Sequence, residues 1–297
     1  MKKWIKAARL RTLPLSLAGI VLAAFLAAAQ GKFDWVIFIL SVLTASLFQI
    51  LSNFANDYGD GVKGTDNKNR VGPARAIQTG EITRKEMKKA IIITAVLSFI
   101  SALLLVLYAF GFSHWPMILF YLVLGIASIA AAIKYTVGKN AYGYFGMGDL
   151  FVLIFFGFVS VAGAYYLYTK EWDWTLIFPS LAIGFLSMGV LNLNNMRDIK
   201  NDAVSGKNTI PVKVGIEKAK KYHFLLMLLP LFFAQAYNFH HLHSAWQWLF
   251  VFPYILILVH AMKVMMTDNP ENLDPELKKL AIATFLFAFF FGLGQIL

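Results

Sequence analysis

Cysteine is absent from this 297-residue sequence, and charged residues are scarce. The lack of cysteine excludes a disulfide framework, a thiolate nucleophile and cysteine metal sites, and it leaves the redox compartment open. Only 14% of the residues are charged, whereas 59% are hydrophobic. The core of a soluble domain does not need so much apolar surface, so the composition indicates a membrane protein.

Long apolar runs recur along the whole chain. A window of about 20 apolar residues is long enough to cross a bilayer as an α-helix. Nine such windows are present, and they cover residues 12–30, 35–56, 89–111, 115–135, 148–168, 174–196, 222–239, 246–266 and 278–296. We therefore expect an all-α, polytopic membrane protein with nine transmembrane helices in one continuous domain over residues 1–297.

The basic residues alternate from loop to loop. All but two of the 27 Lys and Arg residues fall in the N-terminal arm or in every second loop, and the exceptions are Lys32 and Lys170. By the positive-inside rule the basic loops are cytoplasmic, which places the N-terminus inside and the C-terminus outside a cell membrane. Most Trp residues fall at the opposite boundary, where this side chain is enriched. The net charge of +11 therefore indicates contact with a lipid bilayer and not with nucleic acid.

The N-terminal segment has the general pattern of a secretory signal, with a basic head, an apolar stretch and small residues at Ala27 and Ala29. The apolar stretch is too long for the core of a signal peptide. We expect the segment to be retained as the first transmembrane helix.

Acidic and amide side chains gather at the cytoplasmic end of the second window, in the first acid segment NFANDYGDGVKGTD (residues 53–66). Asn53, Asp57 and Asp60 are spaced by four and three residues, so in a helix they share one face. Glycines that follow weaken the helix, and Asp66 is expected on a loop that could fold back toward this face.

A second acid segment, NLNNMRDIKNDAVSGKNT (residues 192–209), ends the sixth window. Asn194, Asp198 and Asp202 are spaced by four residues, again on one side of a helix. A carboxylate near hydrocarbon costs about 2.5 to 3.5 kcal/mol, so two such clusters indicate a site. Oxygen ligands without His or Cys suit Mg²⁺, whose shell a phosphorylated substrate would complete. The alternative, interfacial acids neutralised by Lys and Arg, is disfavoured because the pattern occurs twice.

These residues resemble the UbiA superfamily of intramembrane prenyltransferases, whose two aspartate-rich motifs bind magnesium diphosphate. Asn53, Asp57 and Asp60 look like the first motif, and Asn194, Asp198 and Asp202, followed by GKNTIPVKVG, look like the second. The resemblance spans nearly the whole chain and implies a UbiA-like helical bundle, Mg²⁺ as cofactor and a polyprenyl diphosphate as donor. It also implies that Asp57, Asp60, Asp198 and Asp202 are the catalytic acids, and that these four, Asn53 and Asp66 are the metal ligands.

Further segments are similar to the branch that prenylates 1,4-dihydroxy-2-naphthoate on the route to menaquinone. They are WIKAARLRTLPLSLAG at the N-terminus, NDYGDGVKGTD, and RVGPARAIQTGEIT at residues 70–83. The first motif departs from the usual pattern: the superfamily spaces its two acids by four residues, whereas Asp57 and Asp60 are three apart and Asp66 follows. Whether Asp60 or Asp66 is the second metal ligand stays open.

Polar side chains near the acids are candidates for binding the diphosphate that the resemblance implies. They are Asn53, Asn194, Arg197, Lys200 and Lys207, together with Lys134, Tyr135 and Lys139 from the glycine-rich segment YTVGKNAYGYFGMGD. The alternative for each Lys is an anchor to anionic lipid.

The acceptor that the resemblance implies is an aromatic acid, whose carboxylate needs a cation. Arg70 or Arg75 is the candidate, because guanidinium pairs with carboxylate in a bidentate manner, and the sequence does not choose between them. Asp149 could assist removal of a ring hydroxyl proton, although it is equally explained as a helix-terminal acid. The prenyl tail would lie along an apolar channel open to lipid.

Other interpretations are compatible with parts of the pattern. A transporter also carries acids within membrane helices, but these acids lie at one cytoplasmic level instead of near the midplane. Within the superfamily the acceptor could instead be 4-hydroxybenzoate, haem or a chlorophyll precursor. His240, His241 and His243 resemble a metal-binding tract, but they fall on the external side and are interpreted as a solvated loop.

Overall fold

Helices and short loops make up the part of the chain that the structure describes. The computed structural model describes residues 2–67 and 70–297, and no β-strand occurs within those ranges. The expected all-α fold class is therefore confirmed. In chain order the elements are α1 (Lys2–Ala8), η1 (Leu10–Thr12), α2 (Leu13–Ala29), α3 (Trp35–Lys63), α4 (Arg84–Phe110), α5 (Trp115–Lys134), η2 (Tyr142–Phe145), α6 (Gly148–Val152), η3 (Leu153–Gly163), α7 (Ala164–Thr169), η4 (Trp174–Leu176), α8 (Ile177–Arg197), α9 (Ile199–Val204), α10 (Ile210–Val214), α11 (Ile216–His240), η5 (Ala245–Trp248), α12 (Val251–Met266), η6 (Pro270–Leu273) and α13 (Asp274–Gly294).

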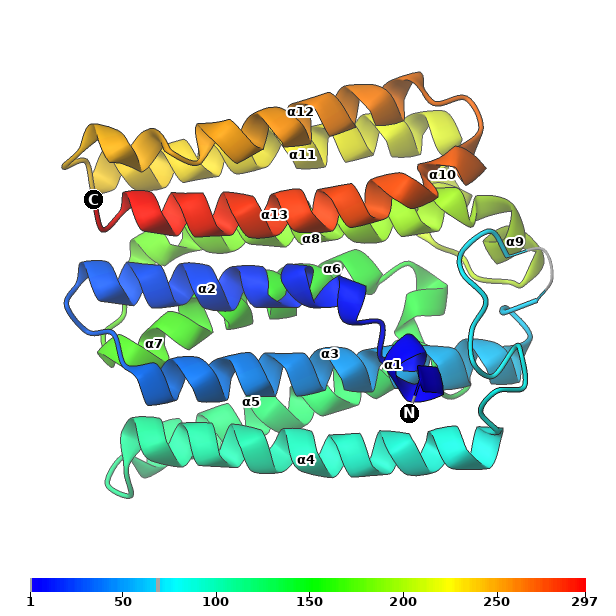
Figure 1. Ribbon diagram of the computed structural model, residues 1–297, viewed down its shortest axis with the longest axis horizontal. Coiled ribbons are helices and arrows are strands. Elements are labelled where there is room, and N and C mark those ends of the chain that lie inside the picture. Colours follow the sequence, from blue (N-terminus) through cyan, green and yellow to red (C-terminus); the bar gives the residue numbers. More distant parts are fainter. Residues whose placement is uncertain (1, 68–69) are drawn as a thin grey trace.

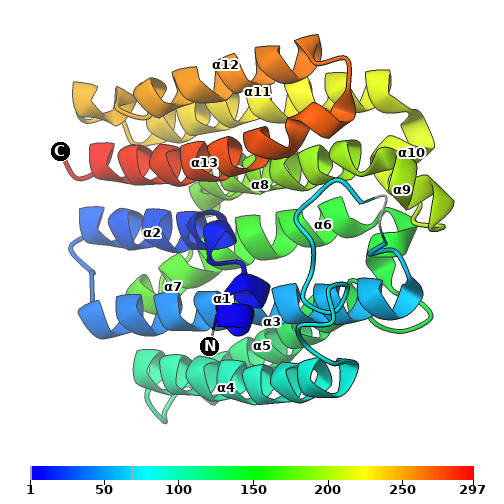
Figure 2. The same cartoon turned by 45° about the vertical axis from the view of Figure 1, so that its right-hand side comes forward.

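The long helices lie side by side in a bundle (Figure 1). α2 lies between α13 and α3, α4 and α5 pack against α3, and α8 packs against α11, α13 and η3. α1 packs against α3. The short helices α9 and α10 and the loop after α3 lie toward one end, and the C-terminus lies at the other (Figures 1 and 2). Segments far apart in the sequence therefore meet at the end that carries α9 and α10.

Eight helical segments of the described chain are long and apolar enough to cross a membrane. They coincide with eight of the nine windows expected from the sequence. The remaining window, 222–239, lies within α11, which is 25 residues long and packs against α8 and α12. The chain is therefore a multi-pass membrane protein, and the ninth crossing stays a prediction.

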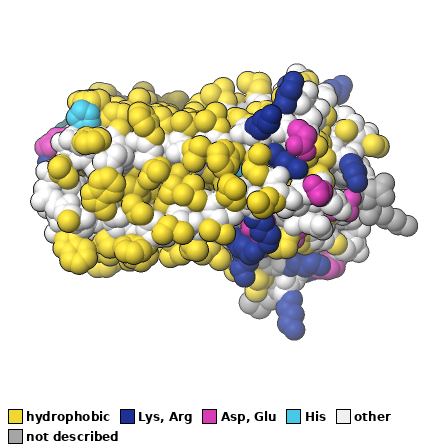
Figure 3. Space-filling view, turned by 90° about the horizontal axis from the view of Figure 1, so that it is seen from above, with side chains coloured by type: hydrophobic (Ala, Val, Ile, Leu, Met, Phe, Trp, Pro, Cys, Tyr) yellow, Lys and Arg dark blue, Asp and Glu magenta, His cyan; other side chains and the backbone are white. Residues whose placement is uncertain are grey.

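The surface is apolar over most of the length of the bundle and charged toward one end. Figure 3 shows hydrophobic side chains over most of the bundle, with Lys and Arg gathered toward one end. Large apolar side chains such as Leu119, Phe232 and Val259 are exposed. An extended apolar surface of this kind faces lipid.

Two defined helix ends bound the loop that carries Asp66. α3 ends at Gly64, whose φ of 79° lies in the left-handed region that favours glycine. α4 begins with a capping box, in which the side chains of Thr83 and Glu86 each accept a hydrogen bond from the other residue's backbone N–H. Residues 65–67 and 70–82 are thereby kept out of both long helices, and they fold back over the end of α3.

A π-helical stretch, η3, continues α6 and packs closely on two neighbours. A Cβ on Gly157 would lie 2.6 Å from the carbonyl oxygen of Ser180 in α8, and a Cβ on Gly19 in α2 would overlap Ser160. Small residues let membrane helices approach each other in this way. The packing holds η3 in place as one wall of the cavity described below.

A buried polar chain connects α11, α12 and α13. His223 Nε2 and His260 Nε2 are 3.0 Å apart, and His260 Nδ1 lies 3.0 Å from Glu276 Oε2. The other carboxylate oxygen of Glu276 pairs with Lys263 and Lys279, each at 2.8 Å. Both histidines and Glu276 are buried, so the chain links three helices through polar contacts in an apolar surrounding.

Candidate active site

The first acid segment places its carboxylates on one buried face at the end of α3. Asn53, Asp57 and Asp60 are all buried, as their spacing predicts. Asp66 follows the left-handed turn at Gly64 and folds back toward them, and it is also buried. The loop therefore adds a third carboxylate to the two on the helix.

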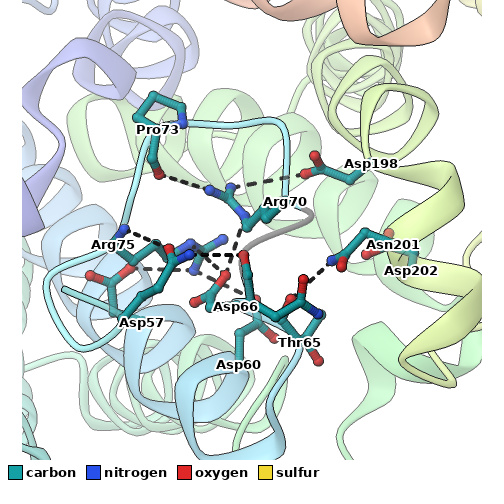
Figure 4. Close-up of polar contacts among 12 residues, drawn as sticks. Asp57, Asp60, Thr65, Asp66, Arg70, Pro73, Arg75, Asp198, Asn201 and Asp202 are labelled. Atoms are coloured by element: carbon teal, nitrogen blue, oxygen red, sulfur yellow. Dashed lines mark hydrogen bonds and ion pairs between the residues drawn. The ribbon is translucent and has the colours of Figure 1, made fainter.

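One guanidinium group connects these three carboxylates (Figure 4). Arg75 Nη1 lies 3.3 Å from Asp57 Oδ1 and 3.5 Å from Asp60 Oδ2. Arg75 Nε lies 3.2 Å from Asp66 Oδ1. The arginine proposed from the sequence to bind an acceptor thus neutralises the acid cluster in this structure.

The N-terminal arm contributes a second cation. Arg9, which follows α1, forms an ion pair with Asp57. Asn53 Nδ2 donates to the carbonyl oxygen of Ala8 at 2.9 Å and to Thr12 Oγ1 at 3.2 Å. Asn53 therefore holds the turn that carries Arg9, while its amide oxygen accepts a hydrogen bond from Gln49 Nε2 at 3.5 Å.

The second acid segment is built around Arg197 at the end of α8. Arg197 binds Asp198 through two bonds, Nη2 to Oδ2 at 2.5 Å and Nε to Oδ1 at 3.1 Å. It also donates to Asn194 Oδ1 at 2.9 Å and to Asp274 Oδ1 at 2.6 Å. The helix is interrupted at Asp198, so Asp202 lies on the separate short helix α9 and not on the continuous helical side that the spacing predicts.

The two acid segments meet (Figure 4). Arg70 Nε lies 3.2 Å from Asp66 Oδ1, and Arg70 Nη2 lies 3.9 Å from Asp198 Oδ2. Asn201 Nδ2 donates to the carbonyl oxygen of Thr65 at 2.9 Å. Clusters separated by more than a hundred residues in the sequence are therefore joined by an ion-pair network and a backbone contact.

Two guanidinium groups lie close to the backbone of Gly72 in the RVGPAR loop. A Cβ on Gly72 would lie 2.8 Å from both Arg197 Nη2 and Arg70 Nη2. A larger side chain at this position would require the ends of both arginine side chains to shift. The glycine thus permits the close approach of the two acid segments.

Lys207 and Tyr144 complete the cluster on the side of α9. Lys207 Nζ lies 3.9 Å from Asp202 Oδ1. The hydroxyl of Tyr144 donates to Asp60 Oδ1 at 2.9 Å and lies 2.6 Å from Thr65 Oγ1. The glycine-rich segment that contains Tyr144 is therefore in direct contact with the first acid segment.

Burial changes the acidity of the loop carboxylates. Burial raises the pKa of Asp66 to about 6, although Arg75 opposes the shift. Burial likewise raises the pKa of Asp202 to about 6, against the effect of Lys207. Burial also acts on Asp198, but the hydrogen bond and charge of Arg197 outweigh it and lower the pKa of Asp198.

A cavity of about 720 Å³ runs from this charged cluster into the bundle. It continues between α2, α3, α4, α5 and η3 past apolar side chains such as Leu105 and Phe155. A site of this shape can hold an anionic group at one end and a long apolar group along its length. Its polar end is lined by Asp57, Asp60, Arg70, Arg75, Arg197 and Lys207.

The other residues selected from the sequence divide into two groups. Asn53, Tyr135 and Asn194 line the cavity. Lys134 and Lys139 are exposed and lie outside its lining, so their assignment to a diphosphate stays a prediction without support from their position. Lys200 is also exposed, and it pairs with Glu271 at 3.3 Å. Tyr222 donates to Asp149 at 2.7 Å, and Asp149 is outside the lining as well.

The donor chemistry of the cluster suits a hard divalent ion. Asp66 Oδ2 and Asp202 Oδ2 are buried without a hydrogen-bond partner in the described structure. Such carboxylate oxygens are ligands that Mg²⁺ accepts. In residues 2–67 and 70–297, however, no three His, Cys, Asp or Glu side chains are placed around one common metal position. The carboxylates therefore fit Mg²⁺ by ligand type. In this structure, however, arginine side chains lie between the carboxylates and supply the positive charge that a metal ion would supply.

Sequence reasoning missed several members of the cluster. Arg9 gave no signal beyond the positive charge of the N-terminal arm, and Tyr144 could not be distinguished from the neighbouring tyrosines of its segment. Asp274 and Asn201 carried no pattern at all. Their roles depend on contacts between segments, which local spacing does not report.

Solved structures share this fold. The structure of a UbiA homolog from Archaeoglobus fulgidus bound to DMAPP and Mg²⁺ matches with a TM-score of 0.64 at 17% identity, over 97% of this chain and 98% of that one. The apo structure of a UbiA homolog from Aeropyrum pernix K1 matches with a TM-score of 0.65 at 17% identity, over 95% and 96%. At this level of identity the likeness concerns the fold alone.

Curated relatives are much more similar in sequence. The 1,4-dihydroxy-2-naphthoate octaprenyltransferase of Escherichia coli (strain K12) is 44% identical over 291 residues, which cover 98% of this chain and 94% of that protein. The protein of the same name from Haemophilus influenzae is 40% identical over 300 residues, covering 100% and 96%. The profile of the UbiA prenyltransferase family matches residues 17–288. The chain therefore belongs to the UbiA prenyltransferase family.

Proposed function

We propose that this protein transfers a polyprenyl group from a polyprenyl diphosphate to 1,4-dihydroxy-2-naphthoate, with release of CO₂ and diphosphate, and so forms demethylmenaquinol. The observation that carries the proposal is the cavity, which joins a charged end to an apolar length. The names of relatives that are 44% and 40% identical over nearly the whole chain support the choice of acceptor.

The charged end suits the diphosphate of the donor. Lys207 and Arg197 line the cavity beside the second acid segment, and Asp57 and Asp60 face it from the first. Bound Mg²⁺ would supply Lewis-acid stabilisation of the leaving diphosphate. The cationic side chains add preorganised electrostatic stabilisation in a site away from bulk water. We assign Asp60, which lines the cavity, as the second ligand of the first motif, and Asp66, whose buried Oδ2 has no hydrogen-bond partner, as a further oxygen ligand from the loop.

The arginines that now neutralise the acids are available for substrate anions. Arg9 and Arg75 both pair with Asp57. If a metal engaged that carboxylate, Arg9 would lose this partner and Arg75 would lose one of its three, so that both guanidinium groups could bind an anion in the cavity. Arg75 or Arg70 then binds the carboxylate of the acceptor, because both line the cavity and a guanidinium group fits a carboxylate in a bidentate manner.

The bond changes balance without an added base. The allylic carbon to oxygen bond breaks, and its electron pair leaves with the diphosphate. The ring carbon that bears the carboxylate forms the new bond to the allylic carbon. The bond to the carboxylate then breaks, CO₂ leaves, and that electron pair restores the aromatic ring. Asp149, bound to Tyr222 and outside the cavity lining, is not needed as a base.

We further propose that the protein lies in the cell membrane with its charged end toward the cytoplasm. The alternation of basic loops along the sequence supports this orientation. The gathering of Lys and Arg at one end of the bundle agrees with it (Figure 3). Donor and acceptor headgroups would then reach the site from the cytoplasmic side, and the prenyl tail from the lipid.

The direct test uses membranes that contain the protein. They are supplied with radiolabelled geranylgeranyl diphosphate, Mg²⁺ and a panel of aromatic acids, and the lipid-soluble product is identified by mass. A decarboxylated, prenylated naphthalenediol is the expected product. Prenylation of 4-hydroxybenzoate without the naphthoate product would contradict the proposed acceptor, and the absence of any prenylated product would contradict the reaction class.

A further inference from the structure

Tyr144 contacts both acid segments at once. Its hydroxyl donates to Asp60 Oδ1 at 2.9 Å and lies 2.6 Å from Thr65 Oγ1. Lys207 Nζ lies 5.7 Å from the centroid of its ring, and Lys63 Nζ lies 3.7 Å from the same centroid. Tyr144, Asp60, Thr65 and Lys207 are buried, so the contacts among them are formed away from bulk water, whereas Lys63 is exposed. One side chain thus contacts a carboxylate of the first acid segment and an ammonium group of the second.

The backbone strengthens this connection. The N–H of Asn208 donates to the carbonyl oxygen of Tyr144 at 3.0 Å. Tyr144 is therefore held from its main chain by the second acid segment and from its side chain by the first. A change at this residue acts on the separation of the two segments and not on one of them alone.

A neighbouring tyrosine provides the contrast. Tyr142 belongs to the same short helix, η2, but its hydroxyl donates to the carbonyl oxygen of Ala131 at 2.9 Å. That contact ties η2 to the end of α5 and involves no acid. The contact with Asp60 is therefore specific to Tyr144 and not a general property of this tyrosine-rich segment.

The hydroxyl of Tyr144 determines how Asp60 is presented. It binds Oδ1, while Oδ2 lies toward Arg75 at 3.5 Å inside the cluster. Without the hydroxyl, the orientation of the carboxylate would depend on the 3.5 Å ion pair with Arg75. The ring acts separately, because a cation within about 6 Å of an aromatic centroid is attracted to the ring face. Lys207 lies within that range of Tyr144.

We propose that Tyr144 is a positioning residue of the diphosphate site, holding Asp60 through its hydroxyl and Lys207 through its ring. The inference rests on the proposed prenyl transfer, because it assigns Asp60 to the metal and Lys207 to the diphosphate. It predicts that two parts of one side chain control two separable properties. The hydroxyl sets the metal requirement, and the ring sets the affinity for the donor.

Tyr144→Phe removes only the hydroxyl. The Mg²⁺ concentration for half-maximal activity should rise about tenfold, the factor expected for a lost hydrogen bond to a charged group, with kcat at saturating Mg²⁺ changed by less than about twofold. Binding of Mn²⁺ with inorganic diphosphate, followed by electron paramagnetic resonance without turnover, should weaken equally. Tyr142→Phe is the matched control and should leave both readings unchanged. Wild-type metal affinity in Tyr144→Phe would overturn the role of the hydroxyl.

Tyr144→Leu removes the ring as well. The KM for prenyl diphosphate should rise about threefold beyond that of Tyr144→Phe, as expected for loss of the buried cation–π contact with Lys207; the contact with Lys63, which is exposed, is lost as well. In a double-mutant cycle with Lys207→Met, the two effects on this KM should not add, because they remove the same contact. Equal KM values in Tyr144→Leu and Tyr144→Phe, or additive effects in the cycle, would overturn the role of the ring.

Failure of this inference can be distinguished from failure of the proposed function. If the wild-type protein forms no prenylated product, the proposed function fails, yet the Mn²⁺ measurement still compares Tyr144→Phe with wild type. If the wild-type protein is active and Tyr144→Phe binds metal normally, only the positioning role fails. The unfolding temperatures of the purified variants in detergent identify any variant that is misfolded. If Tyr144→Leu is misfolded, Tyr144→Phe, which keeps the ring, decides whether the hydroxyl has the proposed role.

Discussion

Asn201 of the second acid segment donates a 2.9 Å hydrogen bond to the backbone carbonyl of Thr65 in the first. Both residues are buried, so the bond is formed in a region where an unpaired amide would be costly. Together with Arg70, which lies between Asp66 and Asp198, it makes the two acid segments one structural unit. The predictions below follow from treating them as one site.

Removal of a carboxylate from either segment should abolish prenyl transfer. Asp57→Ala and Asp198→Ala should each lower kcat by about 100-fold or more, because each removes a carboxylate that would hold the metal ion, and the metal ion stabilises the leaving diphosphate. EDTA should reproduce the loss in the wild-type protein, and added Mg²⁺ should restore activity. Membrane insertion and yield should be unchanged. Normal turnover in either variant would remove the argument for a metal at that segment.

Replacement of Arg75 should affect the acceptor more than the donor. Arg75→Lys keeps a charge near Asp57, Asp60 and Asp66 but loses the planar fork. The KM for the naphthoate acceptor should rise about tenfold, with a smaller change for prenyl diphosphate. Arg70→Lys is the matched variant. A larger effect in that variant would indicate that Arg70, and not Arg75, binds the carboxylate of the acceptor. An unchanged acceptor KM in both variants would contradict a role of either arginine in binding the acceptor.

Metal affinity should depend on pH near 6. Burial raises the pKa of both Asp66 and Asp202 to about 6, so below that pH the metal-free protein keeps protons on carboxylates that Mg²⁺ needs ionised. The Mg²⁺ concentration for half-maximal activity should therefore fall as pH rises from 5 to 7. The same raised pKa values mean that these two groups add stability to the metal-free fold below the pKa of the unfolded chain, and that this contribution is lost as pH rises through 6.

A titration of activity against Mg²⁺ at several pH values measures this dependence. Asp66→Asn should make it shallower, since one of the two titrating groups is gone. A half-saturating concentration that does not vary between pH 5 and 7 would contradict the assignment of these carboxylates to the metal site.

Asp149→Asn should have little effect. The loss of CO₂ provides the electron pair that restores the acceptor ring, so no external base is required, and Asp149 is already bound by Tyr222. We expect a loss of less than about threefold in kcat/KM, equivalent to under about 1 kcal/mol. A loss of a hundredfold or more would show that a base is needed and that Asp149 supplies it.

Glu276 should contribute to stability and not to catalysis. It is buried and bonds His260 as well as two lysines, outside the cavity lining. Glu276→Leu should lower the free energy of unfolding by about 2 kcal/mol, through loss of hydrogen bonds to charged groups, with normal KM values at low temperature. Glu271, which is exposed and pairs with Lys200, is the control, because a surface ion pair contributes little. An unchanged melting temperature in Glu276→Leu would contradict this role.

The length of the apolar windows was enough to predict the long helices, and helical periodicity was enough to predict the shared face of the first acid segment. The spacing of Asn53, Asp57 and Asp60 determines that they share a face, since it needs only the geometry of one helix. The same argument failed in part at Asp198, where α8 is interrupted and α9 begins. Residue spacing alone does not report such an interruption.

The composition of the cluster was harder to predict. The arginines that separate the carboxylates come from the N-terminal arm and the 70–75 loop, so their positions depend on how distant segments fold together. The charge of Arg9 was read as part of the membrane topology signal, and its contact with Asp57 has no counterpart in sequence spacing. The apolar window at 222–239 likewise predicted the central part of α11 but not its first turns, which begin at Ile216 and are rich in lysine. Hydropathy does not report where a helix continues beyond the membrane.

The central claim is that the two acid segments form one metal-dependent diphosphate site, and diphosphate binding without turnover tests it most directly. Purified wild-type protein, Asp57→Asn and Asp198→Asn would be titrated calorimetrically with a non-reactive prenyl thiodiphosphate, with and without Mg²⁺. We predict that the wild-type protein binds tightly only with Mg²⁺ and that each substitution, one in either segment, removes this Mg²⁺-dependent binding. Wild-type affinity in either variant would contradict a shared site.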